Sequence, residues 1–151
     1  MTTAIGAEPT DRPKSRAVAV YLPAVLRVLI GILFVVMGLN LIFNFLPQPP
    51  GQMSPGAVAF GSGLAASGYM PVLLGGTQVV AGALLLANRF VPLALVLLAP
   101  VIVNIVFFHA FLQRSGLVIA IPVAAIEIYL AWVYRDYFRS VLTSRAKPFS
   151  Q

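Results

Sequence analysis

The chain has 151 residues, of which 60% are hydrophobic and 9% charged, and its formal net charge is +6. Soluble domains carry about 25% charged residues, which they need to cover their surface. The composition therefore excludes an ordinary soluble enzyme. It also excludes a disordered chain, because disordered chains are poor in apolar residues. The class that remains is an integral membrane protein.

Cysteine is absent, which excludes disulfides, thiolate metal sites and dithiol redox chemistry. One histidine and four carboxylates leave too few ligands for a metal site built by the protein alone. The ten basic residues lie at the ends of hydrophobic runs rather than along one face. This distribution favours anchoring beside anionic lipid, and no nucleic-acid partner is expected.

The first predicted span covers residues 22–46 and follows a basic N-terminal lead, residues 1–20, that we expect to be flexible. Its length is sufficient for a hydrocarbon core about 30 Å thick at a rise of about 1.5 Å per residue. Pro47, Pro49 and Pro50 end the helix. No small-residue cleavage site follows, which indicates a retained helix rather than a signal peptide.

A short helix is predicted in the uncharged segment that comes next. Ser54 before Pro55 is typical of an N-cap and a first helical residue, and Gly68 is typical of a helix end. Phe60 and Leu64 lie four residues apart and share one face. Because this helix is too short to span, we expect it to lie in the membrane interface and cover the bundle.

Three further spans are predicted at residues 71–87, 90–112 and 117–137, followed by a basic tail at 140–151. The predicted fold is an all-α membrane protein, a four-transmembrane-helix bundle over residues 21–139 with a short interfacial helix between spans 1 and 2. In this topology all of the ten Lys and Arg residues except Arg114 lie on one side. The positive-inside rule then places the protein in the inner (cytoplasmic) membrane with both termini cytoplasmic.

Small residues recur at helical spacing along the predicted spans. Helices pack closely in lipid where small side chains let the backbones approach. The same stripes carry polar residues, which favours a face directed into the bundle. We expect helix packing at Gly31, Gly38, Gly75, Gly82, Ala124 and Ala131.

Several segments resemble the DoxX family of small bacterial and archaeal membrane proteins. They are Gly68-Tyr69-Met70-Pro71 with Gly75-Gly76, residues 88–93, residues 99–109, Gly38-Leu39-Asn40 and residues 127–132. The resemblance covers roughly residues 25–139 and implies a four-helix membrane bundle. It also implies an association with membrane redox systems, because named relatives include subunits of an archaeal terminal quinol oxidase and of a thiosulfate–quinone oxidoreductase. No haem or metal motif accompanies it, so catalysis by this chain alone is not expected.

Glu127 lies near the middle of the fourth predicted span. A charged group there costs about 2.5–3.5 kcal/mol, whereas a leucine contributes only about 0.3–0.6 kcal/mol. We therefore expect Glu127 to be protonated or paired with Arg, Asn, Gln or His of a neighbouring helix. Two interpretations stay open: a proton relay or ligand contact, and a neutral carboxyl that bonds two helices together.

Polar side chains also gather in the outer half of the predicted bundle, where His109 and several amides lie at similar depth. One interhelical amide bond contributes about 0.6 kcal/mol, so helix association alone explains any one of them. Their common depth predicts a cavity open toward the uncharged loop. Its predicted ligand-binding residues are Gln78, Asn104, His109, Glu127 and Asn40.

His109 has two interpretations: a hydrogen-bond partner for a quinone head group or proton acceptor, and a structural partner of Gln113 or the outer loop. Because Asn104 and His109 are about 140° apart around the helix axis, both cannot point straight at one centre.

Arg27 is expected to snorkel to the head groups. Three phenylalanines of the third span either wall the cavity or face lipid or core: Phe107, Phe108 and Phe111.

Two functions follow from these expectations. The first is an accessory subunit of a quinone-linked membrane redox assembly, which binds a quinone-like or other amphipathic small molecule. The second is a purely structural subunit packed on other membrane-protein subunits, without a ligand of its own. A transporter is less well supported, because there is one mid-membrane carboxylate and no evident internal repeat. No catalytic residue and no metal ligand is predicted, and membrane lipid is an expected partner.

Overall fold

The computed structural model describes residues 12–47 and 53–138, with side chains from residue 21 onward. Within these ranges every regular element is a helix and there is no strand, which confirms the predicted all-α class. Helix α1, Arg12–Phe43, begins well before the predicted start at residue 22. Residues 12–20 are therefore helical rather than a flexible lead, because Pro13 lies in the first helical turn, where proline is tolerated, and residues 14–20 contain no glycine or proline. Pro23 lies inside α1 without ending it. The remainder of the lead and the predicted tail lie outside the described residues.

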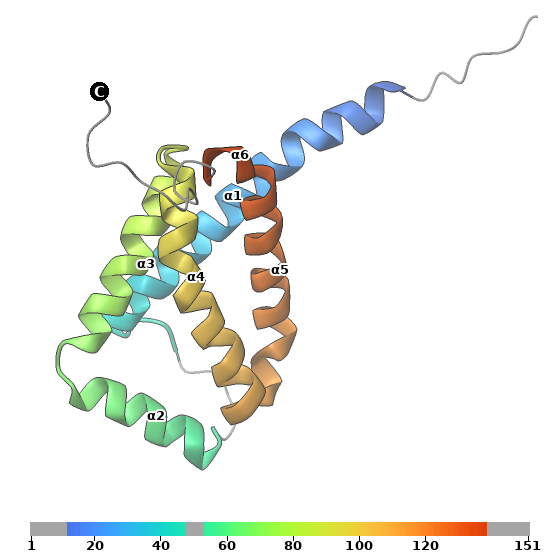
Figure 1. The fold of residues 1–151 in the computed structure, drawn as a ribbon. Helices are drawn as coiled ribbons and strands as arrows, with labels where there is room; N and C mark the ends of the chain where they lie inside the picture. The colour runs from blue at the N-terminus through green and yellow to red at the C-terminus, as the bar shows by residue number, and fades with distance from the viewer. Residues whose placement is uncertain (1–11, 48–52, 139–151) are drawn as a thin grey trace, which may run out of the picture.

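The other helices follow in chain order: α2 Pro55–Ala66, α3 Met70–Leu86, α4 Val91–Phe107, η1 Phe108–Leu112, η2 Arg114–Gly116, α5 Leu117–Val133 and α6 Arg135–Phe138. Element η1 is a π-helix that continues α4, and η2 is a single 3₁₀ turn. The four long helices α1, α3, α4 and α5 form the bundle, and α2 lies across one end of it (Figure 1). Helix α1 packs mainly against α3, and α4 lies between α3 and α5.

Three helices of the described chain are long and apolar enough to cross a membrane: Tyr21–Phe43, Val91–Leu112 and Arg114–Val133. Helices α2 and α3 pass the same test only as a pair, and they meet at a bend of 92°. Helix α3 alone has 17 residues, which corresponds to about 25 Å at about 1.5 Å per residue. The chain is thus a multi-pass membrane protein with three spans, or four if the bent pair forms one.

Helices α1 and α3 approach each other most closely at two pairs of glycines. A Cβ atom added to Gly38 would lie 2.6 Å from the carbonyl oxygen of Gly75, and one added to Gly75 would lie 2.5 Å from that of Gly38. Two turns away, a Cβ on Gly82 would lie 2.7 Å from the carbonyl oxygen of Gly31. The pairing of 31 with 82 and of 38 with 75 shows that the helices run antiparallel. Only glycine permits this separation of the backbones.

Arg27 lies inside this interface rather than among the head groups, so the expectation that it snorkels is wrong. Its side chain is 8% exposed, and its Nη1 donates a hydrogen bond to the carbonyl oxygen of Leu85. Leu85 lies in the final turn of α3, and its carbonyl oxygen also accepts from the N–H of Asn88 at 3.1 Å, so Arg27 adds a further donor to this oxygen. The guanidinium of α1 therefore supplies a donor to the C-terminal end of α3.

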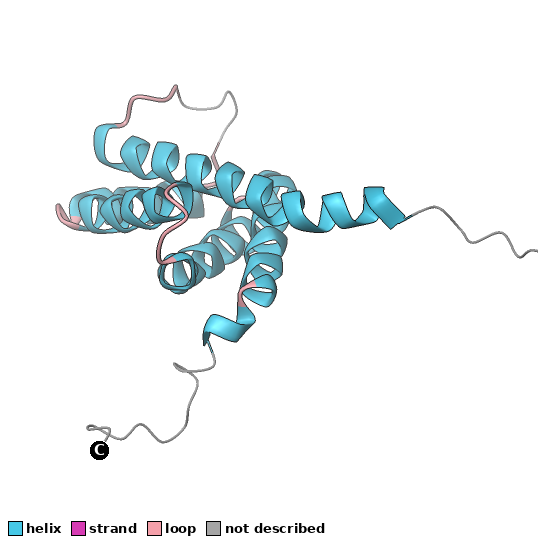
Figure 2. Ribbon diagram, turned by 90° about the horizontal axis from the view of Figure 1, so that it is seen from above, coloured by secondary structure: helices cyan, strands magenta, loops and turns pink. Residues whose placement is uncertain are grey.

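The apolar core lies where the four long helices meet. Its largest fully buried side chains are Phe34, Ile30, Leu85, Leu98 and Leu130, which come from all four. Many large apolar residues on the outer faces of these helices are exposed, as expected where lipid replaces water. Figure 2, viewed along the bundle, shows α1 extending beyond the other helices toward its N-terminal end.

Candidate functional site

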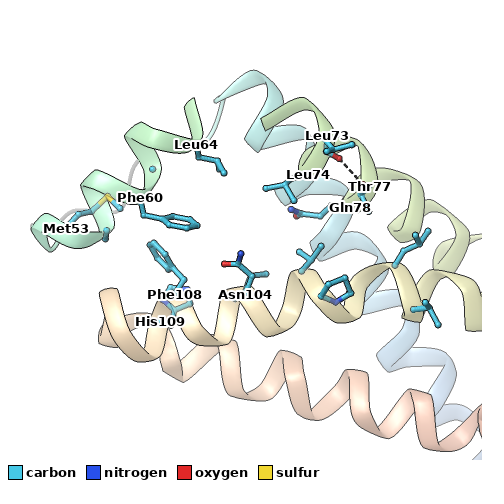
Figure 3. Close-up of a pocket in the computed structure, with 17 residues that line it drawn as sticks. Met53, Phe60, Leu64, Leu73, Leu74, Thr77, Gln78, Asn104, Phe108 and His109 are labelled. Carbon is cyan, nitrogen blue, oxygen red and sulfur yellow. Dashed lines mark hydrogen bonds between the residues drawn. The ribbon is translucent and has the colours of Figure 1, made fainter. Parts of the chain in front are cut away.

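A cavity of about 710 Å³ lies between α2, α3 and the α4–η1 helix (Figure 3). Its volume is within the range of about 300–1,000 Å³ that is typical of small-molecule sites. Most of its wall is apolar, with side chains such as Leu74 from α3 and Val101 from α4. This is the composition of a ligand pocket that encloses an apolar body and contacts a few polar atoms.

Two amide side chains provide polar atoms to this cavity. Gln78 comes from α3 and is 7% exposed, whereas Asn104 comes from α4. Figure 3 shows both amides pointing into the space between the two helices. Among the residues that the structure describes, neither side chain has a hydrogen-bond partner. Of the two residues Gln78 is buried and Asn104 is exposed. An unsatisfied buried amide such as that of Gln78 costs about 1–3 kcal/mol, which a ligand with matching polar atoms would offset.

Helix α2 covers the cavity with an apolar face that includes Phe60 and Leu64. The ring of Phe60 contacts that of Phe108 of η1, with centroids 5.5 Å apart. The face predicted from the spacing of Phe60 and Leu64 is therefore the face turned toward the bundle. At the other end of α2, Gly68 has φ +75°, a conformation that glycine adopts without strain, and the chain turns there into α3.

Ser54 makes three hydrogen bonds at the start of α2, and two of them attach this helix to the end of η1. Its hydroxyl accepts from the N–H of Ala57 at 3.1 Å, which makes it the predicted N-cap, and donates to the carbonyl oxygen of Leu112. The N–H of Ser54 donates to Oε1 of Gln113 at 2.9 Å. Each of these groups would otherwise lack a partner at a helix end. The contacts fix one end of the cover.

His109 lies at the edge of the cavity and is held by the turn that follows it. Its Nδ1–H donates to the backbone oxygen of Gln113 at 3.0 Å, because a carbonyl can only accept. In a neutral ring this leaves Nε2 as an acceptor. A Cβ on Gly116 would overlap the imidazole ring, so glycine at this position makes room for His109. The geometry corresponds to the structural alternative for His109, although the residue also lines the cavity.

The structure brings together three of the five predicted ligand-binding residues, Gln78, Asn104 and His109. The other two lie elsewhere, which corrects the prediction of a single site. Oδ1 of Asn40 accepts from the N–H of Leu46 at 2.8 Å and closes the end of α1. Glu127 lines a different cavity, between α4 and α5. Rise per residue gives depth in the membrane, but not the direction in which a side chain points around its helix.

The other residues singled out in the sequence do not share one site either. Phe108 lines the cavity, whereas Phe107 and Phe111 are 58% and 80% exposed on the outer surface. Ala124 borders the second cavity and Ala131 is half-buried. Gln113 is predicted only as a partner of His109, whereas it contacts α2, η1 and η2. Its only sequence signal is a polar residue in a turn, and that signal does not identify a partner 59 positions away.

Within the described ranges, no group of three or more His, Asp or Glu side chains could hold a metal ion. A comparison with protein-family models finds the family described as DoxX over residues 22–110, which is more than half of the chain. No curated protein and no solved structure matches the chain.

Proposed function

The chain belongs to the DoxX family, and we propose that this membrane protein binds a quinone-like or other amphipathic small molecule in the cavity between α2, α3 and α4. The observation that carries the proposal is the pair of unpartnered amides, Gln78 and Asn104, in a cavity whose wall is mostly apolar. A quinone has carbonyl oxygens, and an amide N–H₂ donates to a carbonyl. The ring and tail of a quinone are apolar, as is most of the remaining wall.

The position of the cavity supports the same class of ligand. It lies beneath α2, at the end of the bundle where α1 and α4 end and α3 and α5 begin (Figure 1). A molecule dissolved in the bilayer would reach it without crossing water. His109 at the edge would offer its Nε2 to a hydroxyl of the reduced ligand, because Nδ1–H is already bonded.

As an accessory subunit, the protein would hold this ligand for a membrane redox assembly in the inner membrane, with both termini cytoplasmic. In this function electron transfer would belong to the partner subunits. The alternative remains a structural subunit that packs on such an assembly without a ligand. Quinone retained by the purified protein supports the first function, and an assembly that forms normally around a ligand-free subunit supports the second.

The test is equilibrium binding of decylubiquinone, a quinone with a short tail, to the protein in lipid nanodiscs, with empty nanodiscs as the blank. We expect saturable binding. The double variant Gln78→Leu/Asn104→Leu should bind about tenfold more weakly or worse, because each lost hydrogen bond contributes about 0.5–1.5 kcal/mol. Asn88→Gly removes an amide from the turn at the other end of the bundle and should leave the affinity unchanged. No binding above the blank, or equal affinity in the double variant, would overturn the proposal.

A further inference from the structure

A second cavity, of about 330 Å³, lies between α4 and α5 and is separate from the one beneath α2. Its walls are apolar side chains such as Ile102 and Val106 of α4 and Ala124 of α5. Glu127 is the one polar residue that borders it. The cavity shares no lining residue with the first one.

The carboxyl of Glu127 lacks a partner in this position. The residue is 7% exposed, and its Oε2 is buried without a hydrogen bond to any described group. Arg27, the buried cation of the bundle, already donates to the carbonyl oxygen of Leu85. An isolated buried carboxyl is costly, and inside membranes such groups are paired with one another, with backbone or with a ligand. A donor from outside the described residues would therefore stabilise this carboxyl.

The cavity is accessible from the lipid-facing side of the bundle. Three residues at its border are 52%, 58% and 70% exposed: Val103, Phe107 and Ile128. They lie on spanning helices, so in a membrane this opening faces acyl chains rather than water. A ligand would enter sideways from the bilayer. An acyl chain could fill the apolar part of the cavity, but it would leave the carboxyl without a donor.

We propose that this cavity binds a small lipid-soluble primary amine, with the ammonium group on Glu127 and the apolar body between α4 and α5. Hydrogen bonds between an ammonium and a carboxylate are about twice as strong as those between neutral groups, and a medium of low dielectric strengthens them further. Benzene fits an apolar cavity of about 150 Å³. The volume here accordingly accommodates one aromatic ring with a short alkyl chain. This proposal is independent of ligand binding beneath α2.

Two matched probes test the proposal: 4-phenylbutylamine, which is protonated at pH 7, and 4-phenylbutanol, which differs only in its head group. Each is titrated into the protein in zwitterionic nanodiscs, with empty nanodiscs as the blank. Wild type should bind the amine at least about tenfold more tightly than the alcohol. In Glu127→Gln this preference should disappear, because the neutral amide keeps the shape of the carboxyl without its charge.

A second variant covers the case in which Glu127→Gln does not fold. Ala124→Leu keeps the carboxyl but fills the cavity, so it should bind the amine at least about tenfold more weakly than wild type does. Equal affinity of the two probes in wild type, or a preference for the amine that survives in Glu127→Gln, would overturn the proposal. Native mass spectrometry that detects a dimer without bound amine would also overturn the proposal, since a second copy of the chain would then occupy this face.

Discussion

The N–H of Ser54 donates a hydrogen bond of 2.9 Å to Oε1 of Gln113, and this bond joins two segments that are 59 residues apart in the sequence. It connects the first turn of α2 to the turn between η1 and η2. The hydroxyl of Ser54 adds a bond to the carbonyl oxygen of Leu112 on the same side. The helix that covers the larger cavity is thus tied to the helix that forms its wall.

We predict that Ser54→Ala loosens this end of α2. The substitution removes both the N-cap bond to Ala57 and the bond to Leu112, and loss of an N-cap alone costs about 0.5–2 kcal/mol. Amide hydrogen exchange in α2 should accelerate by about tenfold, while exchange in α3 stays unchanged. Ser62→Ala, at an exposed serine of the same helix, is the control. Equal exchange in both variants would show that Ser54 does not hold the cover.

Neighbouring glycines of α3 provide a sharp test of the α1–α3 interface. Gly75→Ala places a methyl group 2.5 Å from the carbonyl oxygen of Gly38, and overpacking of this kind costs about 1–3 kcal/mol. Gly76→Ala meets nothing within 4 Å and should be neutral or stabilising by up to about 1 kcal/mol. Thermal unfolding in detergent should therefore separate the two variants. If Gly75→Ala is as stable as Gly76→Ala, the helices do not approach as described.

Arg27 is predicted to stabilise the fold rather than anchor it to lipid. Arg27→Met removes the donor to the carbonyl of Leu85, and a hydrogen bond from a charged group contributes about 1.5–3 kcal/mol. Unfolding by denaturant should show a loss of this size. Arg114→Met, at an exposed arginine in the turn before α5, should change stability by less than about 0.5 kcal/mol. Similar small losses in both variants would instead favour a snorkelling arginine.

The orientation in the membrane is open to a direct labelling test, because the chain has no cysteine. Arg89→Cys lies in the turn between α3 and α4, and Ser115→Cys lies in the turn before α5. The positive-inside rule predicts that a membrane-impermeant maleimide, added to intact cells from outside the inner membrane, labels only Ser115→Cys. Labelling of Arg89→Cys alone would reverse the proposed orientation, and labelling of both from one side would contradict the bundle topology.

Features encoded locally could be predicted from the sequence. The pattern Ser54-Pro55 predicts the start of α2, because an N-cap depends on atoms within the same turn. The apolar runs predict the long helices for the same reason: their period and length are properties of one segment. The small residues on the α1 and α3 stripes identify faces directed inward, but not the atoms that they meet. The buried position of Arg27 was not predicted.

Features that depend on how helices rotate against one another could not be predicted. Gln78 on α3 and Glu127 on α5 border two different cavities, because α4 lies between these helices and contributes side chains to both cavities. The change from α-helix to π-helix at Phe108 arises where the i→i+5 bond from Gln113 closes the last turn. No residue pattern marks it. Such relationships depend on contacts between segments far apart in the sequence, and they set the position of His109 at the cavity edge.

Native mass spectrometry of the protein released from its own membrane tests the binding proposal most directly. Wild type should retain one amphipathic small molecule of quinone-like mass, and Gln78→Leu/Asn104→Leu should lose it while keeping the same helical content and melting temperature within a few degrees. A wild-type protein that carries only phospholipid, or a double variant that retains the same molecule at the same occupancy, would contradict a ligand site beneath α2.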